Sequence, residues 1–291
     1  MTADLTADLT AGVAAGISTG ISTGVSAAAT AATAMTATAT AAVYTGRHRR
    51  AGSPRTAPPE APAWTKANRL LPVQVVVIAK EPVPGRVKTR LTPAFTPLEA
   101  AALAEASLTD TLDAVSRAPV ARRVLALSGR PGRWLPPGFD VIGQRGQGLD
   151  ERIAWALSDA RVTLPLPVVL IGMDTPQVTP ELLAAAAEPL VSRTADATFG
   201  MAEDGGFWLL GLREVDPDLI LGVPMSRGDT GARQLARLEQ AGLRVTMLPE
   251  LTDVDTVREA QQIAALTPGS RFAACMARLR EDAYQPVAAA S

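Results

Sequence analysis

The middle of the chain alternates short apolar runs with longer stretches that are apolar on one side only. Residues 73–78 and 167–172 are apolar and rich in β-branched side chains at almost every position. Such runs are typical of strands buried on both faces, as in a parallel sheet. Further strands are predicted at residues 123–127, 139–142, 197–200, 207–212 and 243–248.

Helical patterns lie between these strands. Thr96, Pro97 and Glu99 form a capping box with proline at the first helical position, which predicts a helix through about Arg117. Its apolar face would contain Leu98, Ala102, Leu108, Leu112 and Val115. The other predicted helices cover residues 150–160, 179–190 and 229–241 and one that begins at Thr256. Because strand and helix alternate, we predict a single α/β domain with a Rossmann-like, doubly wound and mostly parallel sheet over residues 69–282.

The two ends of the chain differ from this pattern. Residues 1–68 are rich in Ala and Thr and then in Pro, and such a segment buries too little apolar surface to offset its ordering entropy. We therefore predict disordered tails at 1–68 and 283–291. The sequence shows neither a basic segment before a Leu-rich core nor a long apolar span, so we expect no signal peptide and no integral membrane segment.

Composition narrows the possible chemistry. The 291 residues carry a net charge of −1, which gives no electrostatic reason to expect nucleic-acid binding. The single cysteine, Cys275, excludes an internal disulfide and fits a cytoplasmic location. The single histidine, His48, lies in the predicted tail, so the domain has no Ser-His-Asp apparatus. Catalysis must therefore use carboxylates, Lys, Arg, backbone dipoles or an oxygen-ligated metal.

The loop after the first strand is the first candidate site. It carries Gly85 and four cations, Lys80, Arg86, Lys88 and Arg90. Ligands of open α/β sheets bind outside the carboxyl ends of the strands, so the loop is placed to bind phosphates. It is neither a Walker loop nor a dinucleotide-binding turn, because the glycine spacing of both motifs is absent. The alternative is a solvated surface loop.

Acidic residues form the other candidates. Asp174 follows the second apolar strand, and Asp253 and Asp255 are two positions apart in an extended segment, so their side chains point the same way. Adjacent carboxylates repel unless a cation lies between them, and Mg²⁺ prefers carboxylates together with phosphate oxygens. The alternatives are that Asp174 caps its turn and that Asp255 caps the next helix.

The remaining candidates are turns. Glu203 and Asp204 precede two glycines, which suggests a tight turn whose backbone a ligand can approach, although a plain turn explains the glycines equally well. Residues 225–230 form a weaker candidate, in which Asp229 could simply cap the helix that follows. Trp208 is expected to pack in the core.

Taken in order, these segments resemble the bacterial family of uncharacterised glycosyltransferase-A-like proteins in the nucleotide-diphospho-sugar transferase superfamily. The resemblance covers about residues 73–263 and rests on four motifs: residues 79–91 (AKEPVPGRVKTRL), 172–176 (GMDTP), 202–207 (AEDGGF) and 253–256 (DVDT). It extends more weakly to phospholactate guanylyltransferases. One departure is Met225-Ser226-Arg227, where the family usually has Trp-Ser-Thr.

The resemblance implies a nucleotide-sugar-transferase type of fold and a set of roles. Lys80, Gly85, Arg86, Lys88 and Arg90 would bind the nucleotide phosphates. Mg²⁺ or Mn²⁺ would be held by the aspartates at 174, 253 and 255.

These observations favour a metal-dependent transferase that uses a nucleoside diphospho-sugar donor and a small-molecule or glycan acceptor. Asp174 would act through its metal, and Glu203 or Asp204 would orient or deprotonate the acceptor. One alternative is a guanylyltransferase-like nucleotidylyltransferase acting on a nucleoside triphosphate and a small phosphorylated acid. Another is a nucleotide-binding module without catalytic activity. Release of nucleoside diphosphate, release of pyrophosphate, and binding without turnover would distinguish the three.

Overall fold

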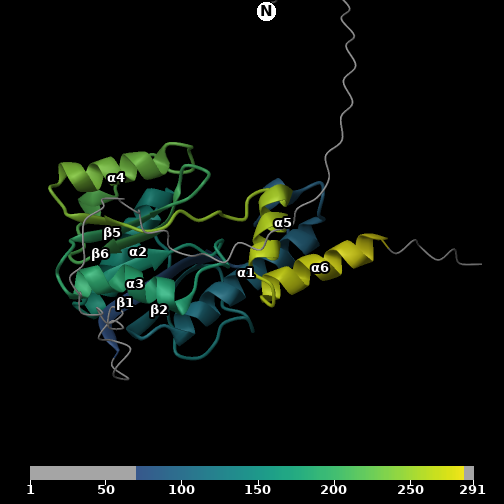
Figure 1. The fold of residues 1–291 in the computed structure, drawn as a ribbon, viewed down its shortest axis with the longest axis horizontal. Helices are drawn as coiled ribbons and strands as arrows, with labels where there is room; N and C mark the ends of the chain where they lie inside the picture. Colours follow the sequence, from purple (N-terminus) through teal and green to yellow (C-terminus); the bar gives the residue numbers. More distant parts are fainter. Residues whose placement is uncertain (1–69, 285–291) are drawn as a thin grey trace, which may run out of the picture. The chain divides into compact units, whose positions relative to one another are not determined.

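The computed structural model describes residues 70–284, which contain a seven-stranded sheet with the order β3-β2-β1-β4-β6-β5-β7 (Figure 1). The strands are β1 Leu71–Lys80, β2 Val120–Ser128, β3 Asp140–Gly143, β4 Val168–Ile171, β5 Ala197–Met201, β6 Phe207–Leu212 and β7 Val245–Met247. All neighbouring strands are parallel except β6, which runs antiparallel to β4 and β5. The predicted mostly parallel α/β fold is confirmed. The tails predicted at 1–68 and 283–291 lie outside the described residues, except that the last helix reaches Tyr284.

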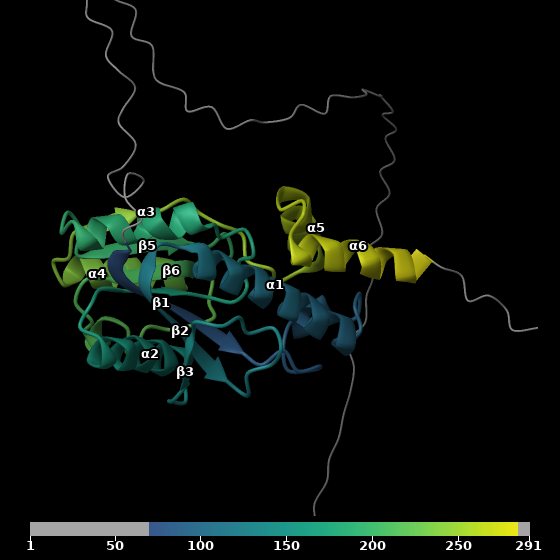
Figure 2. The same cartoon turned by 90° about the horizontal axis from the view of Figure 1, so that it is seen from below.

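Strand β1 lies in the interior of the sheet because it is apolar on both faces. Val75 and Val77 belong to a buried cluster that includes side chains of α1 Pro97–Arg117 and α3 Pro180–Val191. Val76, between them, belongs to a second cluster with α2 Leu149–Thr163 and α4 Thr230–Gln240. Successive side chains of a strand point to opposite faces, so one apolar run supplies both cores. Figure 2 shows α3 on one side of the sheet and α2 on the other.

The start of α1 follows the predicted capping box. The Thr96 hydroxyl accepts a hydrogen bond from the Glu99 backbone, and the Glu99 carboxylate accepts one from the Thr96 N–H at 2.6 Å. The prediction that Leu98 faces the core is wrong, because its side chain is 70% exposed. Leu98 lies seven residues before the exposed Glu105, so these two side chains share the solvent face of the helix.

Two further helices, α5 Val257–Leu266 and α6 Arg271–Tyr284, lie beside α1 and away from the sheet (Figure 1). Together with α1 and the loop after β1 they enclose a third buried core, which we call the C-terminal cluster. Its members are Leu91, Phe95, Ala100, Leu103, Val254, Ala260, Ile263, Phe272, Cys275, Met276 and Leu279. The sequence did not predict α6 as a separate helix. Two short 3₁₀ helices, η2 Thr89–Leu91 and η3 Pro217–Leu219, complete the described elements. Within residues 70–284, no helix is long and apolar enough to cross a membrane.

Candidate active site

A cavity of about 610 Å³ opens at the edge of the sheet where β1 and β4 end. Parallel strands end at one edge, and β6, because it is antiparallel, begins there. The cavity is lined by the ends of β1 and β4, the loop between β3 and α2, the start of β6, and the segments around residues 225–230 and 253–255. The sequence motifs at 79–91, 172–176 and 253–256 therefore meet around one cavity, as the carboxyl-end rule predicts.

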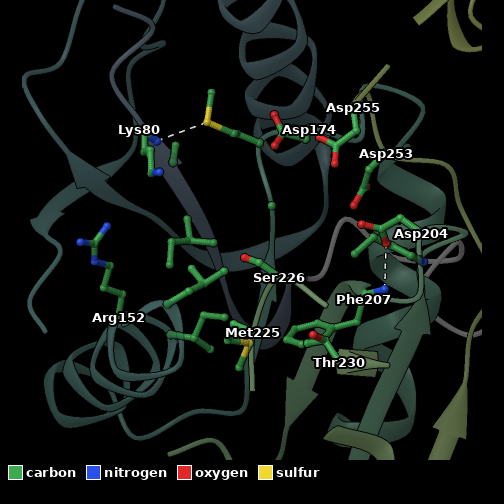
Figure 3. Close-up of a pocket in the computed structure, with 18 of the residues that line it drawn as sticks. Lys80, Arg152, Asp174, Asp204, Phe207, Met225, Ser226, Thr230, Asp253 and Asp255 are labelled. Atoms are coloured by element: carbon green, nitrogen blue, oxygen red, sulfur yellow. Dashed lines mark hydrogen bonds between the residues drawn. The ribbon is translucent and has the colours of Figure 1, made fainter. Parts of the chain in front are cut away.

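Four carboxylates lie along one side of this cavity. Asp174, Asp255, Asp253 and Asp204 follow one another in the close-up, with their oxygens toward the cavity (Figure 3). Burial, followed by the charge of Asp174, raises the pKa of Asp253 to about 7, and the ammonium of Lys88 acts in the opposite direction. A raised carboxyl pKa means that the ionised form lacks sufficient compensating positive charge. This side of the cavity thus has the electrostatic character of a cation site.

Lys88 and Arg90 contact these aspartates. The Lys88 side chain is only 5% exposed, and its Nζ lies 2.8 Å from Asp174 Oδ1 and 3.7 Å from Asp255 Oδ1. It also donates a hydrogen bond to the Val254 carbonyl. Arg90 Nη1 lies 2.6 Å from Asp255 Oδ2. In this structure the two cations therefore neutralise carboxylates, although the resemblance implies that they bind phosphates.

The opposite side of the cavity is cationic. Lys80 and Arg152 lie across from the aspartates in Figure 3, and Arg86 also lines the cavity. Lys80 and Arg86 are exposed, and within the described part of the chain none of the three forms an ion pair. The cavity therefore has separate acidic and basic sides, with cations that remain available to an anionic ligand.

Two of the predicted site residues do not reach the cavity wall. Glu203 is exposed and is absent from the lining, whereas its neighbour Asp204 is part of it. Gly85 is not part of the lining either. Its φ of +76° is one that glycine adopts readily, so it shapes the turn of the loop.

The turn that carries Asp204 packs backbone to backbone against the start of α4. Asp204 Oδ1 accepts a hydrogen bond from the Gly206 N–H at 2.8 Å. Gly205 has a φ of +84°, and a Cβ at this position would lie 2.0 Å from the Gly228 carbonyl oxygen. Gly205, the first of the two glycines in the predicted tight turn, is thus required both by the turn and by this close approach.

The N-terminus of α4 differs from the expectation. Asp229 occupies the N-cap position, but its side chain makes no capping hydrogen bond. Its carboxylate pairs instead with Arg233 at 2.7 Å, one turn further along the helix. Thr230 supplies the local side-chain contact by accepting a hydrogen bond from the Arg227 N–H at 3.1 Å. Asp229 is therefore the N-cap residue by position, as the alternative reading held, but its side chain does not cap the helix. Trp208, as expected, is buried.

Sequence reasoning missed the contribution of the segment between β3 and α2. Gln144 and Gln147 of this segment line the cavity, and so does Arg152 in the first turn of α2. The Gln144 side chain donates to the carbonyls of Ala79 and Ala126, at 2.7 and 2.9 Å, and so ties this segment to the ends of β1 and β2. The available signal was the glycine-rich stretch at residues 143–148, because a strand followed by such a loop and a helix is a common phosphate-binding arrangement.

The carboxylates fit a divalent cation that also binds a phosphate ligand. Within residues 70–284 no group of three or more Asp, Glu, His or Cys side chains is arranged to hold a metal ion, so the aspartates at 174, 253 and 255 are not a preassembled cage. Mg²⁺, however, is usually bound by one or two carboxylates and completes its shell with phosphates and water. Asp174 and Asp253 can supply these two. The solvent-shielded Asp174 Oδ1 has no well-aligned hydrogen bond with a described residue.

Fold and site together define a transferase of the nucleotidyltransferase-like or nucleotide-sugar-transferase-like kind, and comparisons with known proteins support this class. Phosphoenolpyruvate guanylyltransferase from Conexibacter woesei is 32% identical over 187 residues, which are 61% of this chain and 81% of that protein. The crystal structure of a candidate nucleotide-diphospho-sugar transferase from Desulfovibrio desulfuricans G20 matches with a TM-score of 0.65 and 29% identity, over 74% of this chain and 96% of that one.

Residues 111–227 match the family described as uncharacterized protein conserved in bacteria (DUF2064). The chain belongs to the family of phosphoenolpyruvate guanylyltransferase, of which it is a distant homologue. The resemblance inferred from the sequence motifs is thereby confirmed.

Proposed function

We propose that the protein is a metal-dependent nucleotidyltransferase that moves a nucleoside monophosphate from a nucleoside triphosphate to a small anionic acceptor. The observation that carries this proposal is the division of one 610 Å³ cavity into an acidic side and a side whose cations pair with no carboxylate among the described residues. A triphosphate needs both, because it carries several negative charges and binds proteins together with a divalent cation. The homology to a guanylyltransferase also favours nucleotidyl transfer.

The cations would hold the polyphosphate. Lys80, Arg86 and Arg152 line the cavity without carboxylate partners among the described residues, so binding a phosphate would break no ion pair. Arg152 can bind two phosphate oxygens at once through its planar guanidinium, and Lys80 acts as a point charge. Preorganised positive charge of this kind stabilises the charge that develops on the leaving group.

The acidic side would hold the metal. Asp174 and Asp253 would hold Mg²⁺ or Mn²⁺, which would supply positive charge to neutralise the phosphates. Asp255 would keep Arg90 and Lys88 in place through the ion pairs described above. Asp204, with one oxygen held by Gly206, would orient the acceptor.

Residues 70–284 contain no imidazole, which favours an acceptor that is already ionised. The one histidine of the chain, His48, lies outside the described residues. In the proposed transfer an acceptor oxygen forms a bond to the α-phosphorus, and the bond from this phosphorus to the bridging oxygen breaks, so that pyrophosphate leaves with the electron pair. A phosphate or carboxylate acceptor is ionised at neutral pH and needs no general base. We therefore propose a small phosphorylated acid as the acceptor.

Glycosyl transfer from a nucleoside diphospho-sugar, which the sequence slightly favoured, is the second candidate. It is favoured by the Desulfovibrio protein, whose structure matches over nearly its whole length. Here Asp204 would take the proton of an acceptor hydroxyl. The hydroxyl oxygen would form a bond to the anomeric carbon of the sugar as the bond from this carbon to the phosphate oxygen breaks and nucleoside diphosphate leaves.

One experiment separates the two candidates. The protein would be incubated with each nucleoside triphosphate, Mg²⁺ or Mn²⁺, and small phosphorylated acids including phosphoenolpyruvate, and pyrophosphate would be measured. A parallel set would contain nucleoside diphospho-sugars and hydroxyl acceptors, with nucleoside diphosphate as the measured product. Acceptor-dependent pyrophosphate release supports the proposal. Acceptor-dependent release of nucleoside diphosphate alone refutes it in favour of glycosyl transfer, and turnover in neither set refutes both.

A further inference from the structure

We propose that the Lys88 ammonium, which lies between Asp174 and Asp255, takes the place of a divalent cation at Asp174 as long as no nucleotide is bound. The metal then binds tightly only together with the nucleotide, whose phosphates compete with the aspartates for Lys88. This inference rests on the proposed function, because it concerns the metal and nucleotide of the same site.

The contacts of Lys88 are those expected of a bound cation. Its Nζ has three oxygen neighbours: Asp174 Oδ1 at 2.8 Å, Asp255 Oδ1 at 3.7 Å and the Val254 carbonyl. These oxygens come from two segments, the turn after β4 and the segment before α5. Carboxylate and carbonyl oxygens also bind hard divalent cations, so the ammonium and a metal ion would use the same oxygen of Asp174.

Lys88 has an unfavourable backbone conformation and a buried side chain. Its φ of 50° and ψ of 36° lie in the left-handed region, which is unfavourable for a residue with a Cβ. Such a conformation persists where surrounding contacts hold it and is often found at functional sites. The burial of a lysine at 5% exposure points the same way, because a buried ammonium requires partners. The other loop lysine, Lys80, is exposed and has no carboxylate contact among the described residues.

The functional consequence is a coupling between metal and nucleotide. A divalent cation on Asp174 and the ammonium of Lys88 would repel each other at close range, so the free protein binds the metal poorly. A polyphosphate in the cavity offers Lys88 new oxygen partners and adds negative charge beside Asp174. Each of these changes favours the metal, and so nucleotide and metal would bind cooperatively.

The test measures binding of Mn²⁺ alone, without nucleotide, by the electron paramagnetic resonance signal of the free ion. It compares the wild type with Lys88→Met, which keeps the length of the chain and removes the charge. Lys80→Met is the matched control, since it removes the same charge from an exposed position of the same cavity. Lys88→Gln is the second variant, because it retains a donor for the Val254 carbonyl if the Met variant does not fold.

We expect Lys88→Met or Lys88→Gln to bind Mn²⁺ roughly tenfold more tightly than the wild type, and Lys80→Met to bind it as the wild type does. An unchanged or weaker affinity in the Lys88 variants overturns the inference. An equal gain in Lys80→Met also overturns it, since the effect would then be one of general charge. Failure of the proposed function looks different: the wild type would show no turnover with any nucleotide and acceptor, whatever the Mn²⁺ affinities of the variants.

Discussion

The contact between the Asp204 turn and the start of α4 leads to a quantitative prediction for Gly205→Ala. A Cβ at residue 205 would lie 2.0 Å from the Gly228 carbonyl oxygen, whereas an ordinary contact begins at 3.4 Å, so the two segments would have to separate by about 1.4 Å. That movement breaks the hydrogen bond from the Gly231 N–H to the Gly205 carbonyl, which is 2.8 Å long. The lost bond costs about 1 kcal/mol, and a left-handed alanine costs about 1–2 kcal/mol more.

The expected loss is therefore about 2–3 kcal/mol in the free energy of unfolding, measured by urea denaturation at 25 °C. Gly242→Ala is the matched control, because Gly242 has a φ of +74° and a Cβ there would meet nothing within 4 Å. It bears only the conformational cost of about 1–2 kcal/mol. Equal losses in the two variants would refute the reasoning, since they would show that the Gly205–Gly228 approach does not restrict the fold. The Gly205 variant should also show a higher KM for the acceptor, because Asp204 moves with its turn.

Three other substitutions test separate parts of the structure. Arg152→Ala should weaken nucleotide binding by roughly tenfold in calorimetry and change the melting temperature little, because this guanidinium lines the cavity and its hydrogen bonds to the Gly146 and Gln147 carbonyls, at 3.4 and 3.5 Å, are long. Ser107→Ala should lower the free energy of unfolding by about 1–2 kcal/mol in urea, because the buried Ser107 hydroxyl donates to the Met173 carbonyl at 2.9 Å beside the Asp174 turn. Asp196→Asn should destabilise the protein at neutral pH and progressively less below about pH 4, because the Arg244 guanidinium holds the pKa of the Asp196 carboxyl well below its usual range.

The sign of the last effect follows from the direction of the pKa shift. A carboxyl group with a lowered pKa in the folded state contributes stability above its unfolded pKa of about 4, and this contribution is lost as the pH falls through the folded value. A difference in the free energy of unfolding between wild type and Asp196→Asn that stayed constant from pH 7 to pH 3 would contradict this reasoning.

For Arg152, the control is Arg145→Ala, since Arg145 pairs with Asp159 at 2.7 Å and is not part of the cavity lining. Equal nucleotide affinities in the two arginine variants would contradict the assignment of Arg152. For Ser107→Ala, an unchanged urea midpoint would show that the Met173 carbonyl is satisfied in another way.

Strands and helix starts could be predicted from the sequence because the signals are local. The β-branched run predicts strand β1, and the capping boxes at Thr96 and Thr256 predict the starts of two helices, from a few neighbouring residues alone. Both boxes are present in the structure. Helix α6 was missed although Ser270, whose hydroxyl accepts from the Ala273 N–H, is an ordinary N-cap residue. The Asp110 carboxylate of α1 also accepts hydrogen bonds from the backbone N–H groups of Arg271 and Phe272 at the start of α6. No local sequence pattern reveals such a contact between distant residues.

The candidate site was predictable in its location and less so in its pairing. The rule that parallel strands end at one edge brings the loop of Lys88 and the turn of Asp174 to the same cavity. Which cation contacts which oxygen depends on side-chain positions, and the Val254 carbonyl that accepts from Lys88 is 166 residues away in the chain. Arg152 was missed because a single arginine near the start of a helix looks like a surface residue. It reaches the cavity only because α2 begins at the same edge of the sheet.

Val254 connects the site to the smallest of the three buried cores. It is fully buried in the C-terminal cluster, between two aspartates of the acidic side, and the same cluster contains Leu91 and Phe95 from the loop that carries Lys88. The acidic segment and the cationic loop are therefore anchored in one hydrophobic unit, which α5 and α6 complete. A frameshift or early stop codon before α6 would remove part of this hydrophobic unit. It would displace the acidic segment and the cationic loop together, although every strand of the sheet would still be encoded. The part of the gene needed for an intact site thus includes the codons of α6, although this helix follows the last site aspartate and does not line the cavity.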